Sequence, residues 1–164
     1  MKRLSILRHA KSSWDKPDLK DIDRPILPKG IKRTKRICKY LRDNSLIPDC
    51  IITSPALRAL ETANIVIEEL NLSLIPQIDE DFYPGRIEEI VDKVSELNSE
   101  LKHVLLVGHN PCFTDLASEL ANNFEIDWLS TSGLVVIDYD IRGWEFIVGE
   151  KGNCLHYIKP KDLK

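Results

Sequence analysis

The sequence predicts an α/β fold with three layers, in which helices cover both faces of a mainly parallel central sheet that ends in an antiparallel edge strand. Short runs rich in β-branched residues alternate with longer segments in which apolar residues recur at helical spacing. The length of 164 residues and the hydrophobic fraction of 43% suit one globular domain. No repeat of fixed period interrupts the chain, so we expect a single domain over 1–164.

The first half of the chain predicts three strands and two helices. Alternating apolar residues predict a strand over 3–8, and "DCIITS" predicts a buried strand over 49–54. Apolar residues at helical spacing predict helices over 29–43 and 56–70. "LSLIPQI" at 72–78 predicts a weaker strand. Strands that alternate with helices in this way favour parallel pairing.

The second half continues the alternation and then changes to strands. Helical spacing predicts a helix over 86–98, "HVLLVG" predicts a buried strand over 103–108, and a helix follows over 111–122. "LVVIDYD" at 134–140 and "WEFIVG" at 144–149 are separated by "IRG", which predicts a hairpin. This hairpin would supply the antiparallel edge of the sheet.

Composition excludes several classes of protein. The net charge of −3 gives no support for nucleic-acid binding. No apolar run reaches the roughly 18 residues of a membrane span, and the first residues lack the apolar core of a secretory signal. The cysteines are scattered, without metal-ligand or paired spacing; they are Cys38, Cys50, Cys112 and Cys154. We therefore expect reduced thiols and a cytoplasmic location. A monomer is a separate expectation.

Basic and imidazole side chains follow three of the predicted strands. Arg8 and His9 end the first, Arg58 follows the second after a short turn, and His109 ends the strand at 103–108. The carboxyl ends of parallel strands meet at one edge of a sheet, where ligands bind in open α/β folds. Each residue alone has a structural explanation, such as an ion pair or a core hydrogen bond. Their coincidence favours a crevice for a phosphate dianion, because its charge would offset their mutual repulsion.

The predicted helix starts support an anion site. Ser54-Pro55 and Asn110-Pro111 each have the form of an N-cap followed by proline at the first helical position. Both helices would direct free N–H groups and the positive end of the helix dipole at the crevice. Arg58 would lie one turn into its helix, where its guanidinium fork suits two phosphate oxygens. Capping alone also explains the two dipeptides.

Four segments carry a resemblance to a known family. "LRHAKS", "DRPILPKG" at 23–30, "TSPALRALETA" at 53–63 and "VGHNPCFTDLA" at 107–117 occur in this order. Together they resemble the motifs of the histidine phosphatase superfamily, with the spacing of the short SixA-type phosphohistidine phosphatases. The resemblance covers the chain to about the last predicted hairpin. It implies a phosphoglycerate mutase-like fold without the cap insertions of the mutases.

The resemblance implies a role for each matched residue. His9 would be the nucleophile that takes the phosphoryl group, Arg8 and Arg58 would clamp the phosphate oxygens, and His109 would bind the same oxygens. Nearby guanidinium groups would keep His9 unprotonated and therefore nucleophilic. Ser12 and Asn110 are further candidate substrate ligands, although loop and cap roles explain them equally well.

A general acid is less clearly indicated. Relatives that cleave phosphate esters add a carboxylic acid, and "QIDEDFYPGR" offers Glu80 and Asp81. A solvated acidic turn is the alternative explanation, and SixA-type chains have no dedicated acid in this region. An alkoxide leaving group needs a proton donor, whereas the imidazole of phosphohistidine has its own protonatable nitrogen. The absence of an acid would therefore favour phosphohistidine as the substrate.

Three functions follow as expectations, of which the first is preferred. It is a hydrolase of class EC 3.1.3.- that removes phosphate from protein phosphohistidine through phospho-His9. The second is a phosphomonoesterase for a small phosphate ester with Glu80 or Asp81 as acid, and the third is a non-catalytic phosphate-binding module. No cofactor or metal is expected, since the arginines supply the charge that a metal would bring. Two further expectations concern the first loop: an Asp23–Arg24 pair that braces it, and a Trp14 side chain that packs on the sheet or, as the alternative, lines the entrance of the crevice.

Overall fold

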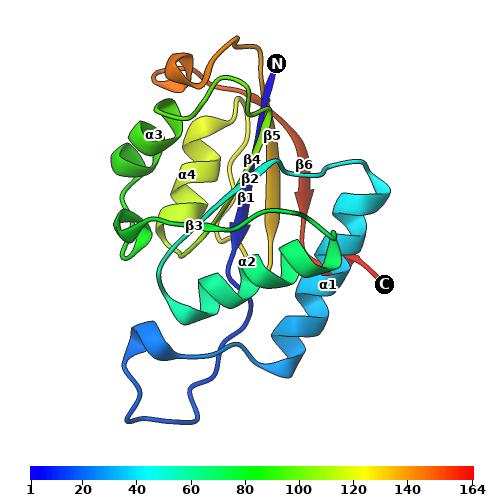
Figure 1. The fold of residues 1–164 in the computed structure, drawn as a ribbon, viewed down its shortest axis with the longest axis vertical. Helices are drawn as coiled ribbons and strands as arrows, with labels where there is room; N and C mark the ends of the chain where they lie inside the picture. Colours follow the sequence, from blue (N-terminus) through cyan, green and yellow to red (C-terminus); the bar gives the residue numbers. More distant parts are fainter.

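A six-stranded sheet runs through the middle of the computed structural model, which describes residues 1–164 (Figure 1). The strand order is β3-β2-β4-β1-β5-β6. The first four strands in this order are parallel neighbours, while β5 runs antiparallel to both β1 and β6. The strands are β1 (Lys2–Arg8), β2 (Cys50–Thr53), β3 (Gln77–Ile78), β4 (His103–Gly108), β5 (Leu134–Tyr139) and β6 (Asn153–Ile158).

Four helices cover the two faces of the sheet. Figure 1 shows α1 (Pro28–Asp43) and α2 (Leu57–Glu69) on one face, and α3 (Ile87–Ser95) and α4 (Cys112–Leu120) on the other. The predicted three-layer α/β fold is therefore confirmed. Four short 3₁₀ helices lie in the connections: η1 (Asp21–Asp23), η2 (Glu80–Phe82), η3 (Trp144–Ile147) and η4 (Pro160–Asp162).

Alternation along the central strands produces a separate core on each face. In β1, Leu4 and Ile6 are fully buried against the α3 and α4 layer, whereas Leu7 is buried against α1 and α2. The first core gains Phe113 from α4, and the second gains Ile37 from α1. Because both faces of β1 are buried, its position and the position of the residues that follow it are firmly fixed.

Two glycines permit close packing at the carboxyl edge of the sheet. A Cβ atom at Gly30 would lie 2.7 Å from the carbonyl oxygen of Lys11, so glycine lets α1 approach the segment after β1. A Cβ atom at Gly108 would lie 2.5 Å from the ring of Phe113, so glycine lets α4 pack on the end of β4. Both contacts bring helix starts close to the ends of parallel strands.

The prediction that residues 144–149 form the second strand of a hairpin is wrong. Residues Trp144–Ile147 form η3, in which Trp144 and Ile147 are both buried and the Trp144 indole N–H donates to the carbonyl of Leu101 at 2.8 Å. The strand that pairs with β5 is β6, further along the chain. A tryptophan anchored in the core and separated by three positions from a buried isoleucine suits a helical turn better than an extended strand.

The weak strand predicted over 72–78 is reduced to Gln77–Ile78. Pro76 immediately precedes these two residues and has no N–H to donate to a sheet. The remaining helices and strands lie within about three residues of the predicted ranges, as expected for sequence-based boundaries. None of the helices combines the length and the apolar character needed to cross a membrane.

Candidate active site

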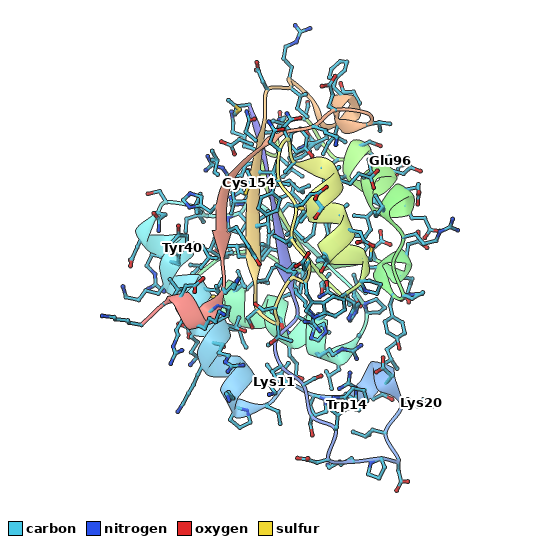
Figure 2. All side chains as sticks on the ribbon, turned by 180° about the vertical axis from the view of Figure 1, so that it is seen from behind. Lys11, Trp14, Lys20, Tyr40, Glu96 and Cys154 are labelled. Atoms are coloured by element: carbon cyan, nitrogen blue, oxygen red, sulfur yellow. The ribbon has the colours of Figure 1, made fainter.

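The carboxyl ends of β1, β2 and β4 open onto one cavity of about 460 Å³. Figure 2 shows Lys11 and Trp14 on the segment that runs beyond this edge of the sheet. No carboxylate lines the cavity, whereas five lysine or arginine residues and two histidines do. The lining residues are Arg8, His9, Lys11, Ser12, Trp14, Arg24, Arg33, Arg58, His109, Asn110 and Thr131. Such a concentration of positive charge requires an anionic ligand or buried counter-charge nearby.

His9 is held by the backbone on both sides of the end of β1. Its N–H donates to the carbonyl of Gly108 at 3.0 Å, and its own carbonyl accepts from the N–H of Ser132 at 3.2 Å. The ring Nδ1 lies 2.7 Å from the carbonyl of Ala10. A carbonyl only accepts, so Nδ1 carries the proton and Nε2 carries the free electron pair.

Burial keeps the His9 ring neutral. The side chain is 6% exposed, and burial together with the nearby His109, Arg58 and Arg8 lowers the pKa of His9 to about 3. The hydrogen bond to Ala10 opposes this shift but does not reverse it. His9 is therefore an uncharged, oriented imidazole at neutral pH, as a nitrogen nucleophile must be.

His109 faces His9 with a ring-centroid separation of 5.1 Å. Its Nε2 lies 2.6 Å from the hydroxyl oxygen of Ser54, which also accepts from the N–H of Ala56 at 3.1 Å. In the tautomer in which the Ser54 hydroxyl donates to Nε2, Nδ1 of His109 carries the ring proton and is an N–H donor. Burial, followed by the charge of Arg58, lowers the pKa of His109 to about 4.

Two buried arginines complete the group. Arg8 donates from Nη1 to the carbonyl of Leu129 at 3.1 Å, and its guanidinium lies 5.5 Å from the ring centroid of Trp128. Arg58 donates from Nη1 to the carbonyl of Asp21 at 2.7 Å and from Nη2 to the carboxylate of Asp21 at 3.0 Å. Burial and the charge of Arg58 lower the pKa of Arg8, although it stays protonated at neutral pH.

Asp21 binds three side chains next to the cavity. Its carboxylate accepts from Arg58, from Arg24 Nε at 3.1 Å and from the Tyr83 hydroxyl at 2.6 Å. Burial opposes ionisation, but the hydrogen bonds from Tyr83, Arg58 and Arg24 outweigh it and lower the pKa of Asp21 to about 2. Asp21 is therefore the counter-charge for the arginines.

Asp21, which accepts from both Arg58 and Arg24, was not among the predicted site residues. The expected Asp23–Arg24 pair is wrong, because Arg24 pairs with Asp21 across one turn of η1. Trp14 does not pack on the sheet, which was the preferred expectation, but lines the cavity, which was the alternative: it is 76% exposed, and its ring centroid lies 3.6 Å from the guanidinium carbon of Arg24. The loop contains several aspartates, and only its folding selects the one beside Arg58.

The cavity leaves three buried polar atoms without a hydrogen-bond partner. They are Nε of Arg8, Nε of Arg58 and Nδ1 of His109, and each is a donor or can be one. An unpaired buried donor costs roughly 1–3 kcal/mol. An oxyanion with several acceptor oxygens would remove all three penalties and also balance the arginine charge.

The remaining candidate ligands differ in what their side chains do. Ser12 lines the cavity, and its hydroxyl accepts from Arg24 Nη1 at 2.8 Å. Asn110 also lines it, but its amide nitrogen donates to Leu129 at 2.7 Å and its amide oxygen accepts from Thr114. Both side chains therefore brace the cavity wall. Glu80 and Asp81 are exposed in η2 and are absent from the lining.

The helix starts beside the cavity differ from the expected caps. Neither proline is the first helical residue, since α2 begins at Leu57 and α4 begins at Cys112. Arg58 is therefore the second residue of α2 and not one turn into it. Ser54 closes a tight turn before α2, and Asn110 accepts from the N–H of Thr114 inside α4 at 3.1 Å. No three histidine, cysteine, aspartate or glutamate side chains are grouped to hold a metal ion.

Buried neutral histidines predict a loss of stability in mild acid. Burial is the main cause that lowers the pKa of His9 to about 3 and the pKa values of His103 and His109 to about 4. The unfolded chain, with histidine pKa values of about 6.5, then binds protons first as pH falls. The contribution of these neutral histidines to the free energy of unfolding is fully present above pH 6.5 and is lost as the pH falls below it. At pH 5 the loss is about 2 kcal/mol per histidine. Urea unfolding at pH 7.5 and pH 5 measures this loss.

A variant at His103 measures how much one histidine contributes to this loss of stability. His103 lies at the opposite end of β4 from the cavity and bonds to the Ser5 hydroxyl at 2.6 Å. His103→Gln should lower stability at pH 7.5 and show a smaller further loss at pH 5. Equal unfolding free energies at the two pH values in the unchanged protein would contradict the expectation.

Comparison with known proteins reveals related sequences. The family model for the histidine phosphatase superfamily (branch 1) matches residues 4–83. An uncharacterized chloroplastic protein of Arabidopsis thaliana is 29% identical over 135 residues, which span 73% of this chain and 59% of that protein. A 2,3-bisphosphoglycerate-dependent phosphoglycerate mutase of Thermobifida fusca is 37% identical over 78 residues, which span 46% of this chain and 32% of the mutase.

A solved structure extends the likeness to the whole fold. The protein histidine phosphatase SixA, complexed with tungstate, superposes with a TM-score of 0.85 at 22% sequence identity, over 99% of both chains. The chain therefore has the same fold as this protein from end to end, including β5, β6 and the helices on both faces.

Proposed function

We propose that the chain, whose residues 4–83 match the family model of the histidine phosphatase superfamily, hydrolyses protein phosphohistidine through a phosphoryl group carried on Nε2 of His9. The three buried donors without partners, on Arg8, Arg58 and His109, are the observation that carries this proposal. They come from three separate parts of the chain and surround one cavity, where the oxygens of a phosphoryl group would satisfy them. The tungstate bound to the related SixA structure is an oxyanion of similar shape and is consistent with such a site.

The first step transfers the phosphoryl group to His9. A bond forms between phosphorus and Nε2 of His9, while the bond between phosphorus and the leaving nitrogen breaks. The hydrogen bond from Nδ1 to Ala10 keeps the electron pair on Nε2 before attack. After attack, the same hydrogen bond stabilises the positive charge that develops on the ring. Arg8, Arg58 and His109 donate to the equatorial oxygens, where phosphoryl transfer needs stabilisation.

The second step returns the phosphoryl group to water. Water attacks phosphorus, the bond to Nε2 breaks, and both protons of the water remain on the phosphate product. His9 recovers its electron pair, with Nδ1 still bonded to Ala10. No oxidant, reductant or second substrate is needed, and the charges that bind the phosphoryl group in the first step serve again in the second.

The lining of the cavity favours phosphohistidine over a phosphate ester. A phosphohistidine whose other ring nitrogen is protonated leaves as a neutral imidazole, whereas an alkoxide requires an acid. No carboxyl group lines the cavity, since Glu80 and Asp81 are exposed on η2, and Asp21 with a pKa of about 2 is ionised at neutral pH. The alternative phosphomonoesterase would need one of these groups as its acid.

A panel of phosphodonors tests the choice of substrate. We expect kcat/KM for a phosphohistidine peptide to exceed that for the matched phosphoserine peptide by at least about 100-fold, the usual contribution of a general acid. Glu80→Gln and Asp81→Asn should leave both values within about twofold, because neither side chain lines the cavity. Rapid phosphoserine hydrolysis that collapses in either variant would favour the phosphomonoesterase instead.

A further inference from the structure

A second hollow of about 310 Å³, here called the basic groove, adjoins the catalytic cavity. The two share Arg33 and Thr131 in their linings. The groove lies where α1, the segment before β5 and η4 meet, and Figure 1 shows the C-terminal end of the chain beside α1. Its lining consists of Arg33, Trp128, Ser130, Thr131, Lys159, Pro160 and Lys161.

All charged groups in the lining of the groove are positive. Arg33, Lys159 and Lys161 line it without any carboxylate, and none of the three forms an ion pair. The adjacent carboxylate of Asp162 accepts instead from the backbone N–H of Lys159 at 3.4 Å. The whole chain has a net charge of −3, so this local excess of cations does not reflect overall composition. Uncompensated cations in a hollow attract and orient anions.

Two further groups in the groove are suited to a ligand. Trp128 is 55% exposed, and its ring lies beside the guanidinium of Arg8, so an exposed aromatic surface connects the groove to the catalytic arginine. Exposed tryptophan is typical of recognition surfaces. The hydroxyl oxygen of Ser130 is buried without a hydrogen-bond partner. It is the fourth such atom in the chain, and the other three belong to the cavity next to it.

We propose that the basic groove binds an acidic segment of the phosphoprotein substrate, whose carboxylates flank the phosphohistidine. This rests on the proposed function, because the segment is defined by the phosphoryl group that enters the cavity. Since Arg33 and Thr131 line both hollows, the groove offers a continuous path for a polypeptide whose phosphohistidine reaches His9. Carboxylates along that path would meet Lys159, Lys161 and Arg33, and a backbone group would meet the Ser130 hydroxyl.

A binding experiment tests the groove without requiring catalysis. A fluorescein-labelled peptide with a run of glutamates and no phosphate is titrated, and its anisotropy is followed at low salt. Lys159→Glu with Lys161→Glu should weaken binding about tenfold or more, as expected for reversed charges at an interface. Lys102→Glu with Lys151→Glu is the matched control, because both lysines are exposed and lie outside both hollows. Equal loss in the two double variants would overturn the proposal.

Turnover then separates the groove from the proposed function. In the unchanged protein, a phosphohistidine peptide with acidic flanks should have a KM about tenfold below that of one with neutral flanks. The groove variant should remove this preference and leave turnover of free phosphoramidate unchanged.

Turnover of both peptides without preference would overturn the groove proposal alone. Failure to hydrolyse any phosphohistidine donor, with groove-dependent peptide binding intact, would overturn the proposed function. Stronger groove-dependent binding of an oligonucleotide than of the acidic peptide would also reject an acidic protein segment as the occupant.

Discussion

Replacing His9 with asparagine should lower turnover of a phosphohistidine substrate by about 10⁴-fold or more, the scale seen when a nucleophile is removed from a preorganised site. Asparagine retains an amide nitrogen that can donate to the Ala10 carbonyl, which His9 contacts at 2.7 Å. It cannot supply the electron pair of Nε2. The arginines and His109 would still bind the phosphoryl group, so the loss should fall on kcat and not on KM.

Trapping the intermediate distinguishes a nucleophile from a binding residue. A labelled phosphodonor should leave the unchanged protein with a phosphoryl group that is labile in acid and stable in base, and should leave His9→Asn unlabelled. His109→Asn is the control, because His109 is buried beside His9 at a ring separation of 5.1 Å but binds oxygens in this mechanism. The His109→Asn variant should therefore still receive the labelled phosphoryl group, but more slowly than the unchanged protein. Labelling of His9→Asn at the normal rate would show that another residue is the nucleophile. No labelling of the unchanged protein would favour a phosphate-binding module.

The strands and helices that form the cavity were predictable because their signals are local. The buried runs that become β1, β2 and β4, and the helical spacing of α1 to α4, each depend on residues close together in sequence. Parallel pairing then forces the ends of those strands to one edge, which is why the positions of Arg8, His9 and His109 could be anticipated without coordinates.

The errors in the fold have a different physical origin. Residues 144–149 have the apolar content of a strand, but Trp144 finds a core position and a hydrogen-bond acceptor at Leu101 that no local pattern encodes. Asn153–Ile158 pairs with β5 although no strand was predicted there, and all of its residues are exposed or half-exposed. Tertiary contacts outweigh local propensity at both places.

The parts of the site that could not be predicted are the side chains that hold the catalytic groups. Asp21 lies 37 residues from Arg58 and 62 from Tyr83 in sequence, yet it bonds to both. Its loop has little secondary structure, so neither periodicity nor capping indicates which aspartate pairs with Arg58. One signal was available: two arginines expected at the same edge of the sheet require a counter-charge, and the long loop after β1 is rich in aspartate.

Arg58→Ala should lower kcat/KM by about 10² to 10³-fold, which is the usual cost of removing a preorganised donor to a developing oxyanion. Arg58 is 5% exposed, and its Nε has no partner in the protein. Two other N–H groups are held by Asp21 at 2.7 and 3.0 Å, so the guanidinium is fixed with its remaining donors free. Arg58→Lys should recover only part of the loss, because an ammonium cannot bond to Asp21 and two phosphate oxygens in one plane.

Asp21→Asn separates the positioning of Arg58 from its charge. Asparagine keeps an oxygen that can accept from Arg58 Nη2, and the backbone carbonyl at this position still accepts from Nη1. The loss of the charge-assisted bonds should lower kcat about tenfold while the guanidinium remains.

Inhibition by inorganic phosphate provides a second measurement. Arg58→Ala should weaken it strongly because a ligand of the anion is gone, whereas Asp21→Asn should preserve or strengthen it because a competing negative charge is removed. If Asp21→Asn weakened phosphate inhibition as much as Arg58→Ala, Asp21 would be needed to form the anion site itself, and the expectation that it only holds Arg58 in place would be wrong.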